Sequence, residues 1–123
     1  MSKRILVIED TEDNRQIIRD LLTSFDYELV EAVDGAEGVA MAQAHQPDLI
    51  LMDIQLPVMD GYEATRQIRA IPELAAVPIV AVTSYALSGD EAKAREAGCD
   101  GYIAKPFSPR QLLAKIREFL PDG

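Results

Sequence analysis

Short apolar runs alternate with amphipathic stretches along the whole chain. The runs at 49–52 and 79–82 are apolar at every position, which is typical of parallel strands that are covered on both faces. Three further runs have the length of a strand. We therefore predict strands at about 4–9, 27–33, 47–53, 77–83 and 100–104.

The stretches between these strands place apolar residues at the spacing of a helix, and they predict helices at 12–24, 35–45, 61–70, 88–97 and 109–120. The apolar stripe expected on the first helix consists of Ile17, Ile18, Leu21, Leu22 and Phe25. The second helix carries Ala36, Val39, Ala40 and Met41. The fourth has only a weak stripe. Asp60 and Ser108 are the expected N-caps of the third and fifth helices.

Five strand–helix units in 123 residues predict an α/β fold, a doubly wound five-stranded parallel sheet with helices on both faces. The length fits one domain, so we expect residues 1–123 to form a single domain. Glu12, Arg15 and Arg19 are expected to form a solvated face of the first helix.

Charge and cysteine content narrow the class of protein. The 21 acidic and 12 basic residues give a net charge of -9, which would repel a phosphate backbone, so nucleic acid is not expected as a direct partner. The single cysteine, Cys99, cannot form an internal disulfide, which favours a reducing compartment. No signal peptide or membrane-spanning run is recognisable, and we expect a cytoplasmic protein with no membrane contact.

Polar residues that could carry chemistry lie at the carboxyl ends of four predicted strands, where open parallel sheets form their sites. They are the acidic pair Glu9-Asp10, then Asp53, Thr83 and Lys105. Three carboxylates brought together repel one another unless a cation neutralises them, and oxygen ligands without histidine or cysteine favour Mg²⁺. A carboxylate beside Mg²⁺, a hydroxyl and an ammonium group predicts phosphoryl transfer through an acyl phosphate.

The motifs around these residues resemble those of receiver domains of two-component response regulators, the CheY-like superfamily with strand order 2-1-3-4-5. Within that family the chain is similar to stand-alone receivers of the DivK type. The resemblance covers essentially the whole chain. It rests on Ile8-Glu9-Asp10, Leu51-Met52-Asp53-Ile54-Gln55-Leu56-Pro57, Met59-Asp60-Gly61, Ala81-Val82-Thr83-Ser84 and Ala104-Lys105-Pro106-Phe107.

The resemblance implies a role for each site residue. Asp53 would accept a phosphoryl group, and Thr83 and Lys105 would hold its oxygens. Tyr102 would change rotamer as Thr83 moves, so Thr83 and Tyr102 would form the switch. The Lys105-Pro106 bond is a candidate cis peptide.

The same resemblance implies a Mg²⁺ site. Asp10 and Asp53 would bind the ion through their carboxylates and Gln55 through its backbone carbonyl, and Glu9 would complete the site. Glu9 departs from the aspartate that is more common in the family, so the geometry of the ion is less fixed than the identity of its ligands.

The implied activity is that of a signalling phosphoacceptor, whose only catalysis is its own phosphotransfer and slow autodephosphorylation. Its partners would be a sensor histidine kinase or histidine phosphotransfer protein and a downstream effector protein. We expect the bistable element to comprise the 83–85 loop, the 88–97 helix and Tyr102, because the weak apolar stripe of that helix offers little packing against a shift.

Two other function classes fit parts of the pattern. A magnesium-dependent phosphohydrolase with an aspartyl-phosphate intermediate would place a second acid two residues after its nucleophile, where this chain has Gln55. A flavodoxin-like mononucleotide carrier shares the fold. It would need a phosphate-cradling loop after the first strand, where residues 9–13 include four acids.

Overall fold

The computed structural model describes residues 3–83 and 90–121. Its strands are β1 Arg4–Ile8, β2 Glu28–Ala32, β3 Leu49–Asp53, β4 Ile79–Thr83 and β5 Gly101–Ala104. Its helices are α1 Glu12–Ser24, α2 Gly35–His45, α3 Gly61–Arg69, the 3-10 turn η1 Pro72–Leu74, α4 Asp90–Ala97 and α5 Pro109–Phe119. Residues 84 and 85 of the expected switch loop, and the expected start of the fourth helix at 88, lie outside the described residues.

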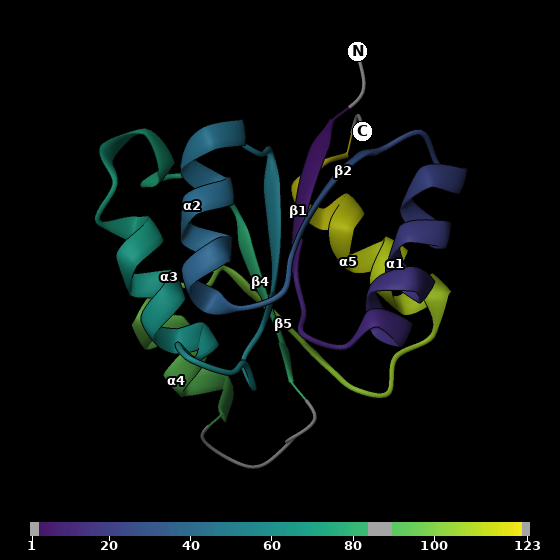
Figure 1. Ribbon diagram of the computed structural model, residues 1–123. Helices are drawn as coiled ribbons and strands as arrows, with labels where there is room; N and C mark the ends of the chain where they lie inside the picture. Colours follow the sequence, from purple (N-terminus) through teal and green to yellow (C-terminus); the bar gives the residue numbers. More distant parts are fainter. Residues whose placement is uncertain (1–2, 84–89, 122–123) are drawn as a thin grey trace.

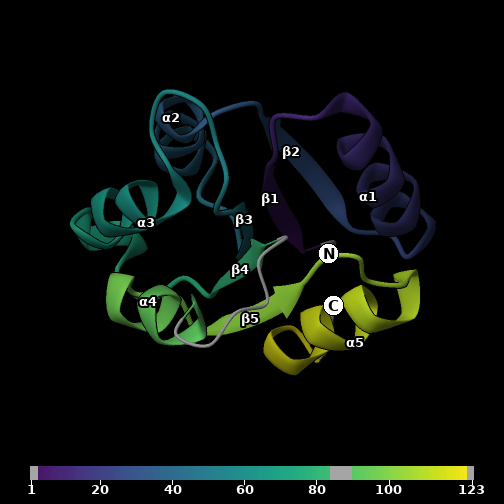
Figure 2. The same ribbon diagram turned by 90° about the horizontal axis from the view of Figure 1, so that it is seen from below.

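The five strands form one parallel sheet in the order β2-β1-β3-β4-β5, which confirms the predicted fold class (Figure 1). Figure 2 shows α1 and α5 on one face of this sheet and α2, α3 and α4 on the other. None of the helices in the described ranges is long and apolar enough to cross a membrane.

Alternate residues of each strand supply the two halves of the core. Ile5 and Val7 of β1 pack under α1 and α5, together with Leu22 and Leu112. Leu6 and Ile8 point to the opposite face and join the cluster that includes Ile68 of α3. Because the central strands are buried on both faces, their carboxyl ends are held rigidly at one edge of the sheet.

The predicted stripe of α1 is only partly correct. Ile18 and Leu22 are buried, but Ile17 is 57% exposed and Phe25 is 42% exposed. Residues 17, 21 and 25 form the neighbouring row of the helix. Leu21 is half-buried against the same core cluster as Ile18 and Leu22, and with Phe25 it also lines a groove toward α5. Of the predicted stripe, only Ile18 and Leu22 are fully buried.

The inward face of α2 also differs from the prediction, because Ala36 and Ala40 are exposed while Gly35, Gly38 and Ala42 are buried. A Cβ atom at Gly38 would lie 2.5 Å from Cδ1 of Ile8. The helix therefore approaches β1 more closely than any larger residue would permit. An apolar stripe cannot reveal this contact, since glycine contributes little hydrophobicity.

The predicted caps are confirmed. The Asp60 side chain accepts a hydrogen bond from Glu63 N at 2.9 Å and begins α3. Ser108 and Gln111 form a reciprocal capping box at the start of α5. These caps end the β3–α3 and β5–α5 loops, which carry residues of the site.

Candidate functional site

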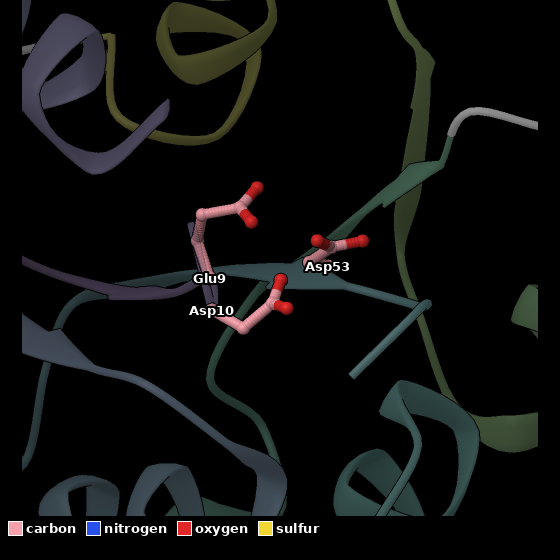
Figure 3. A group of neighbouring side chains, drawn as sticks. All are labelled: Glu9, Asp10 and Asp53. Atoms are coloured by element: carbon pink, nitrogen blue, oxygen red, sulfur yellow. The ribbon is translucent and has the colours of Figure 1, made fainter. Parts of the chain in front are cut away.

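Three carboxylates meet at the carboxyl ends of β1 and β3, as predicted. The two strands are paired with Ile8 opposite Met52, so Glu9 and Asp53 follow side by side. Glu9, Asp10 and Asp53 each offer one oxygen, and these oxygens lie within 4.8 Å of one another. Figure 3 shows the three side chains gathered at this edge of the sheet. Glu9 and Asp53 are each only 3% exposed, whereas Asp10 is exposed to solvent.

Lys105 joins this acidic cluster from the end of β5. Its Nζ donates to Oε1 of Glu9 at 2.8 Å and to Oδ2 of Asp53 at 3.2 Å. Its backbone N–H donates to the carbonyl of Thr83 at 2.7 Å, which fastens the start of the loop to β4. The Lys105-Pro106 bond is cis, as predicted.

Thr83 is the last residue of β4 and is buried at 1% exposure. Its hydroxyl oxygen accepts a hydrogen bond from Nε2 of Gln55 at 2.8 Å. The backbone N–H of Gln55 donates to Oδ1 of Asp53 at 3.1 Å. Gln55 thus connects Asp53 to Thr83 through its backbone N–H and its side-chain amide, whereas the sequence indicated its backbone carbonyl as a metal ligand.

Tyr102 lies in β5, opposite Ala81 of β4, and is half-buried against the core under α2, α3 and α4. It therefore belongs to the strand next to β4, the strand that ends at Thr83. Its expected change of rotamer stays a prediction.

The protonation equilibria of the site reflect burial and crowding of charge. Burial raises the pKa of Asp53, and the charge of Glu9 raises it further, to about 7. Burial also disfavours the charged form of Glu9, but hydrogen bonds from Lys105 and Thr11 hold the pKa of Glu9 below its ordinary value. Burial opposes the charge of Lys105 as well, yet its contacts with Glu9 and Asp53 raise its pKa above the ordinary value. The cluster therefore carries more negative charge than one lysine neutralises, and a further cation would relieve it.

The side chain of Arg15 contradicts the prediction of a solvated residue, because it is only 11% exposed. Its NH1 group donates to the backbone carbonyl of Glu9 at 2.7 Å. Arg19 and Glu12 do lie on the more exposed surface, at 35% and 60%. Helical periodicity gave no signal for Arg15, since the contact runs along the loop between β1 and α1 and not toward the sheet.

A groove of about 180 Å³ opens beside the acidic cluster, between α1 and the β5–α5 loop. It is lined by Glu9, Asn14, Ile17, Ile18, Lys105, Pro106 and Phe107. Most of its lining is apolar, and Glu9 and Lys105 belong both to this groove and to the acidic cluster.

A family model described as the response regulator receiver domain matches residues 5–117. The chain is 41% identical over 123 residues to the polar-differentiation response regulator DivK of Brucella ovis and of Brucella melitensis, with 100% of both chains covered.

Solved structures give the same result. The receiver domain of a sensor histidine kinase from Pseudomonas aeruginosa PAO1 is 38% identical with a TM-score of 0.91, over 99% of this chain and 100% of that one. That structure has a magnesium ion coordinated in its active-site cleft. Chemotaxis protein CheY4 of Vibrio cholerae is 28% identical with a TM-score of 0.92, over 97% and 99% of the two chains. The chain belongs to the family of response regulator receiver domains.

Proposed function

We propose that the protein is a phosphoacceptor of a two-component phosphorelay, and that Asp53 is the residue that takes the phosphoryl group. The observation that carries this proposal is the bridge from Lys105 to both Glu9 and Asp53 at the ends of parallel strands. It places a carboxylate nucleophile beside a fixed cation in a buried site. The full-length similarity to DivK supports a single receiver domain over residues 1–123.

The residues present fit Mg²⁺. The acidic cluster offers hard oxygen ligands that converge from the ends of two strands. Burial and repulsion from the charge of Glu9 raise the pKa of Asp53, and a further cation would reduce this repulsion. We propose that Asp10 and Asp53 bind the ion through their carboxylates, Gln55 through its backbone carbonyl, and that Glu9 completes the site. When bound, Mg²⁺ neutralises charge on the transferring phosphoryl oxygens.

Each residue of the site has its own role in the proposed phosphotransfer. An oxygen of Asp53 attacks the phosphorus of a phosphohistidine on the partner, the new O–P bond forms as the P–N bond breaks, and the electron pair stays with the imidazole nitrogen. Lys105 holds Asp53 in place and donates to a phosphoryl oxygen. The Thr83 hydroxyl donates to another oxygen, and Tyr102 follows the movement of Thr83.

The partners that fit this role are a sensor histidine kinase or histidine phosphotransfer protein as donor and an effector protein as target. The net charge of -9 argues against direct contact with nucleic acid, and no membrane contact is part of the proposal. We place the exchange in the cytoplasm, where the buried thiol of Cys99 stays reduced. Beyond its own phosphotransfer and slow autodephosphorylation, no catalysis is proposed.

Incubation with Mg²⁺ and either acetyl phosphate or a phosphorylated histidine kinase tests the proposal. The expected result is one hydroxylamine-sensitive acyl phosphate per chain, abolished in Asp53→Asn. Asp60→Asn is the matched control, because Asp60 lies on the same loop and asparagine keeps its capping hydrogen bond. Phosphate incorporation that survives in Asp53→Asn would contradict the proposal, and sustained turnover of phosphomonoesters would favour a phosphohydrolase.

A further inference from the structure

Arg15 lies in the first part of α1, where its side chain contacts the backbone of the acidic pair Glu9-Asp10. Its side chain is only 11% exposed, and its guanidinium makes three contacts at once. NH1 donates to the Glu9 carbonyl at 2.7 Å, NH2 pairs with Glu12 at 2.5 Å, and Nε lies 3.4 Å from Oε1 of Glu31. The side chain thus ties the β1–α1 loop to helix α1 and to strand β2.

The carbonyl that Arg15 holds belongs to the peptide between Glu9 and Asp10. Its orientation sets the backbone twist from which the two carboxylates project. The Glu9 side chain is restrained separately, by Lys105 at 2.8 Å and by the N–H of Thr11 at 3.1 Å. Asp10 is exposed, so its direction depends more strongly on the backbone to which it is attached.

Arg15 is itself held in place by groups that are fixed elsewhere. Glu31 of β2 also accepts two hydrogen bonds from Arg19, at 2.8 Å and 2.7 Å. Glu12 pairs with Arg19 as well, at 3.2 Å. The two carboxylates balance the charge of the two arginines. Glu12 and Glu31 each contact Arg15 directly, and these two contacts hold its guanidinium against the Glu9 carbonyl.

We infer that Arg15 is a positioning residue for the proposed Mg²⁺ site: it fixes the Glu9–Asp10 peptide so that both carboxylates converge on Asp53. This inference rests on the proposed function, since it concerns the affinity of that site. A merely electrostatic effect of Arg15 has the opposite sign. A cation near the acids repels Mg²⁺, so its removal would strengthen binding, whereas loss of a brace weakens it.

Titration calorimetry with Mg²⁺ on the wild type, Arg15→Met and Arg19→Met tests the inference. Arg19→Met is the matched control, because it removes the same charge from the same helix while leaving the contacts of Arg15 with Glu9, Glu12 and Glu31 in place. We expect Arg15→Met to bind Mg²⁺ about tenfold more weakly, as is usual when a group that orients a metal ligand is lost. Arg19→Met should bind like the wild type. The amide resonance of Asp10 in the metal-free protein should shift in Arg15→Met alone.

The possible outcomes distinguish a failure of the inference on Arg15 from a failure of the proposed function. Affinity that is unchanged or higher in Arg15→Met overturns the inference while leaving the proposed function intact. Equal losses in both variants also overturn it, because they would reflect charge or general stability. A wild type without saturable Mg²⁺ binding defeats the proposed function itself. Should Arg15→Met unfold, Arg15→Gln decides in the same way, since its amide is too short to reach both the Glu9 carbonyl and Glu31.

Discussion

At the scale of single residues, Gln55 restrains Thr83 before any phosphoryl group is present. The hydrogen bond from Nε2 of Gln55 to the Thr83 hydroxyl is 2.8 Å long, and it must lengthen if Thr83 moves toward Asp53. Gln55→Leu removes this donor but keeps the backbone groups that face Asp53. Since one hydrogen bond contributes about 0.5–1.5 kcal/mol, we expect the variant to bind a phosphoryl mimic such as beryllofluoride about two- to tenfold more tightly. Gln43→Leu on the exposed surface of α2 is the control, and equal or weaker binding by Gln55→Leu would contradict the restraint.

The pKa of Asp53 predicts how the stability of the metal-free protein depends on pH. Its value of about 7 in the folded protein lies above the ordinary 3.8, so between these values the folded protein retains a proton that the unfolded chain has lost. The contribution of Asp53 to the free energy of unfolding is therefore present at low pH and lost as the pH rises toward 7. Glu9, whose pKa is lowered, acts oppositely and only in the more acidic range.

Urea unfolding in a chelating buffer at about pH 5 and about pH 8 measures this contribution. The wild type should lose stability between these conditions, and Asp53→Asn should lose clearly less. An equal loss of unfolding free energy between the two pH values in both proteins would mean that the pKa of Asp53 is not raised in the folded state.

Sequence alone predicted which charged residues converge, but not how they are held. Glu9, Asp10, Asp53 and Lys105 could be brought together in advance because the carboxyl ends of neighbouring parallel strands meet at one edge. The bond from Arg15 to the Glu9 carbonyl depends on rotamers and on distances of a few ångströms. Residue types and their spacing carry no such information.

At the scale of elements, the ends of the five strands and of the α-helices in the described ranges were predictable to within two residues, while the inward faces of α1 and α2 were not. Apolar periodicity locates a helix along the sequence. Which face of the helix is turned toward the sheet also depends on how closely the two pack. In α2 that approach is set by Gly38, whose missing side chain makes room for Ile8. The contact lies one residue before Glu9, so it also supports the edge of the sheet that carries the site.

Gly38→Ala tests this close approach. The new Cβ would lie 2.5 Å from Cδ1 and 2.9 Å from Cγ1 of the fully buried Ile8. Overpacking of this kind costs about 1–3 kcal/mol, which exceeds the helix-propensity gain of about 1 kcal/mol. We expect a net loss of unfolding free energy in urea, partly recovered in the double variant with Ile8→Val, which removes Cδ1. Ala40→Ser on the exposed face is the control, and a stabilised Gly38→Ala would show that α2 can move away from β1.

At the scale of the whole molecule, Arg69 at the end of α3 joins several elements. Its guanidinium donates to the carbonyls of Gly98 at 2.9 Å and Val77 at 2.5 Å, and it pairs with Asp100 at 2.5 Å. Asp100 in turn accepts from the N–H of Ile79 at 3.0 Å. The C-terminal end of α4 and the starts of β4 and β5 are thereby fixed to α3, at the opposite end of the strands from Thr83 and Lys105.

This arrangement predicts that phosphorylation moves α4 about a fixed C-terminal end. Hydrogen exchange with and without beryllofluoride should show changed protection in the first part of α4 and at Tyr102, and little change at 98–100. In Arg69→Met the change should extend to 98–100, because the anchor at Gly98 and Asp100 is lost. Arg66→Met, one turn earlier on the exposed face of α3, is the control. Unaltered exchange throughout α4 and β5 of the wild type would count against any movement of this face and would place the phosphorylation signal elsewhere on the surface.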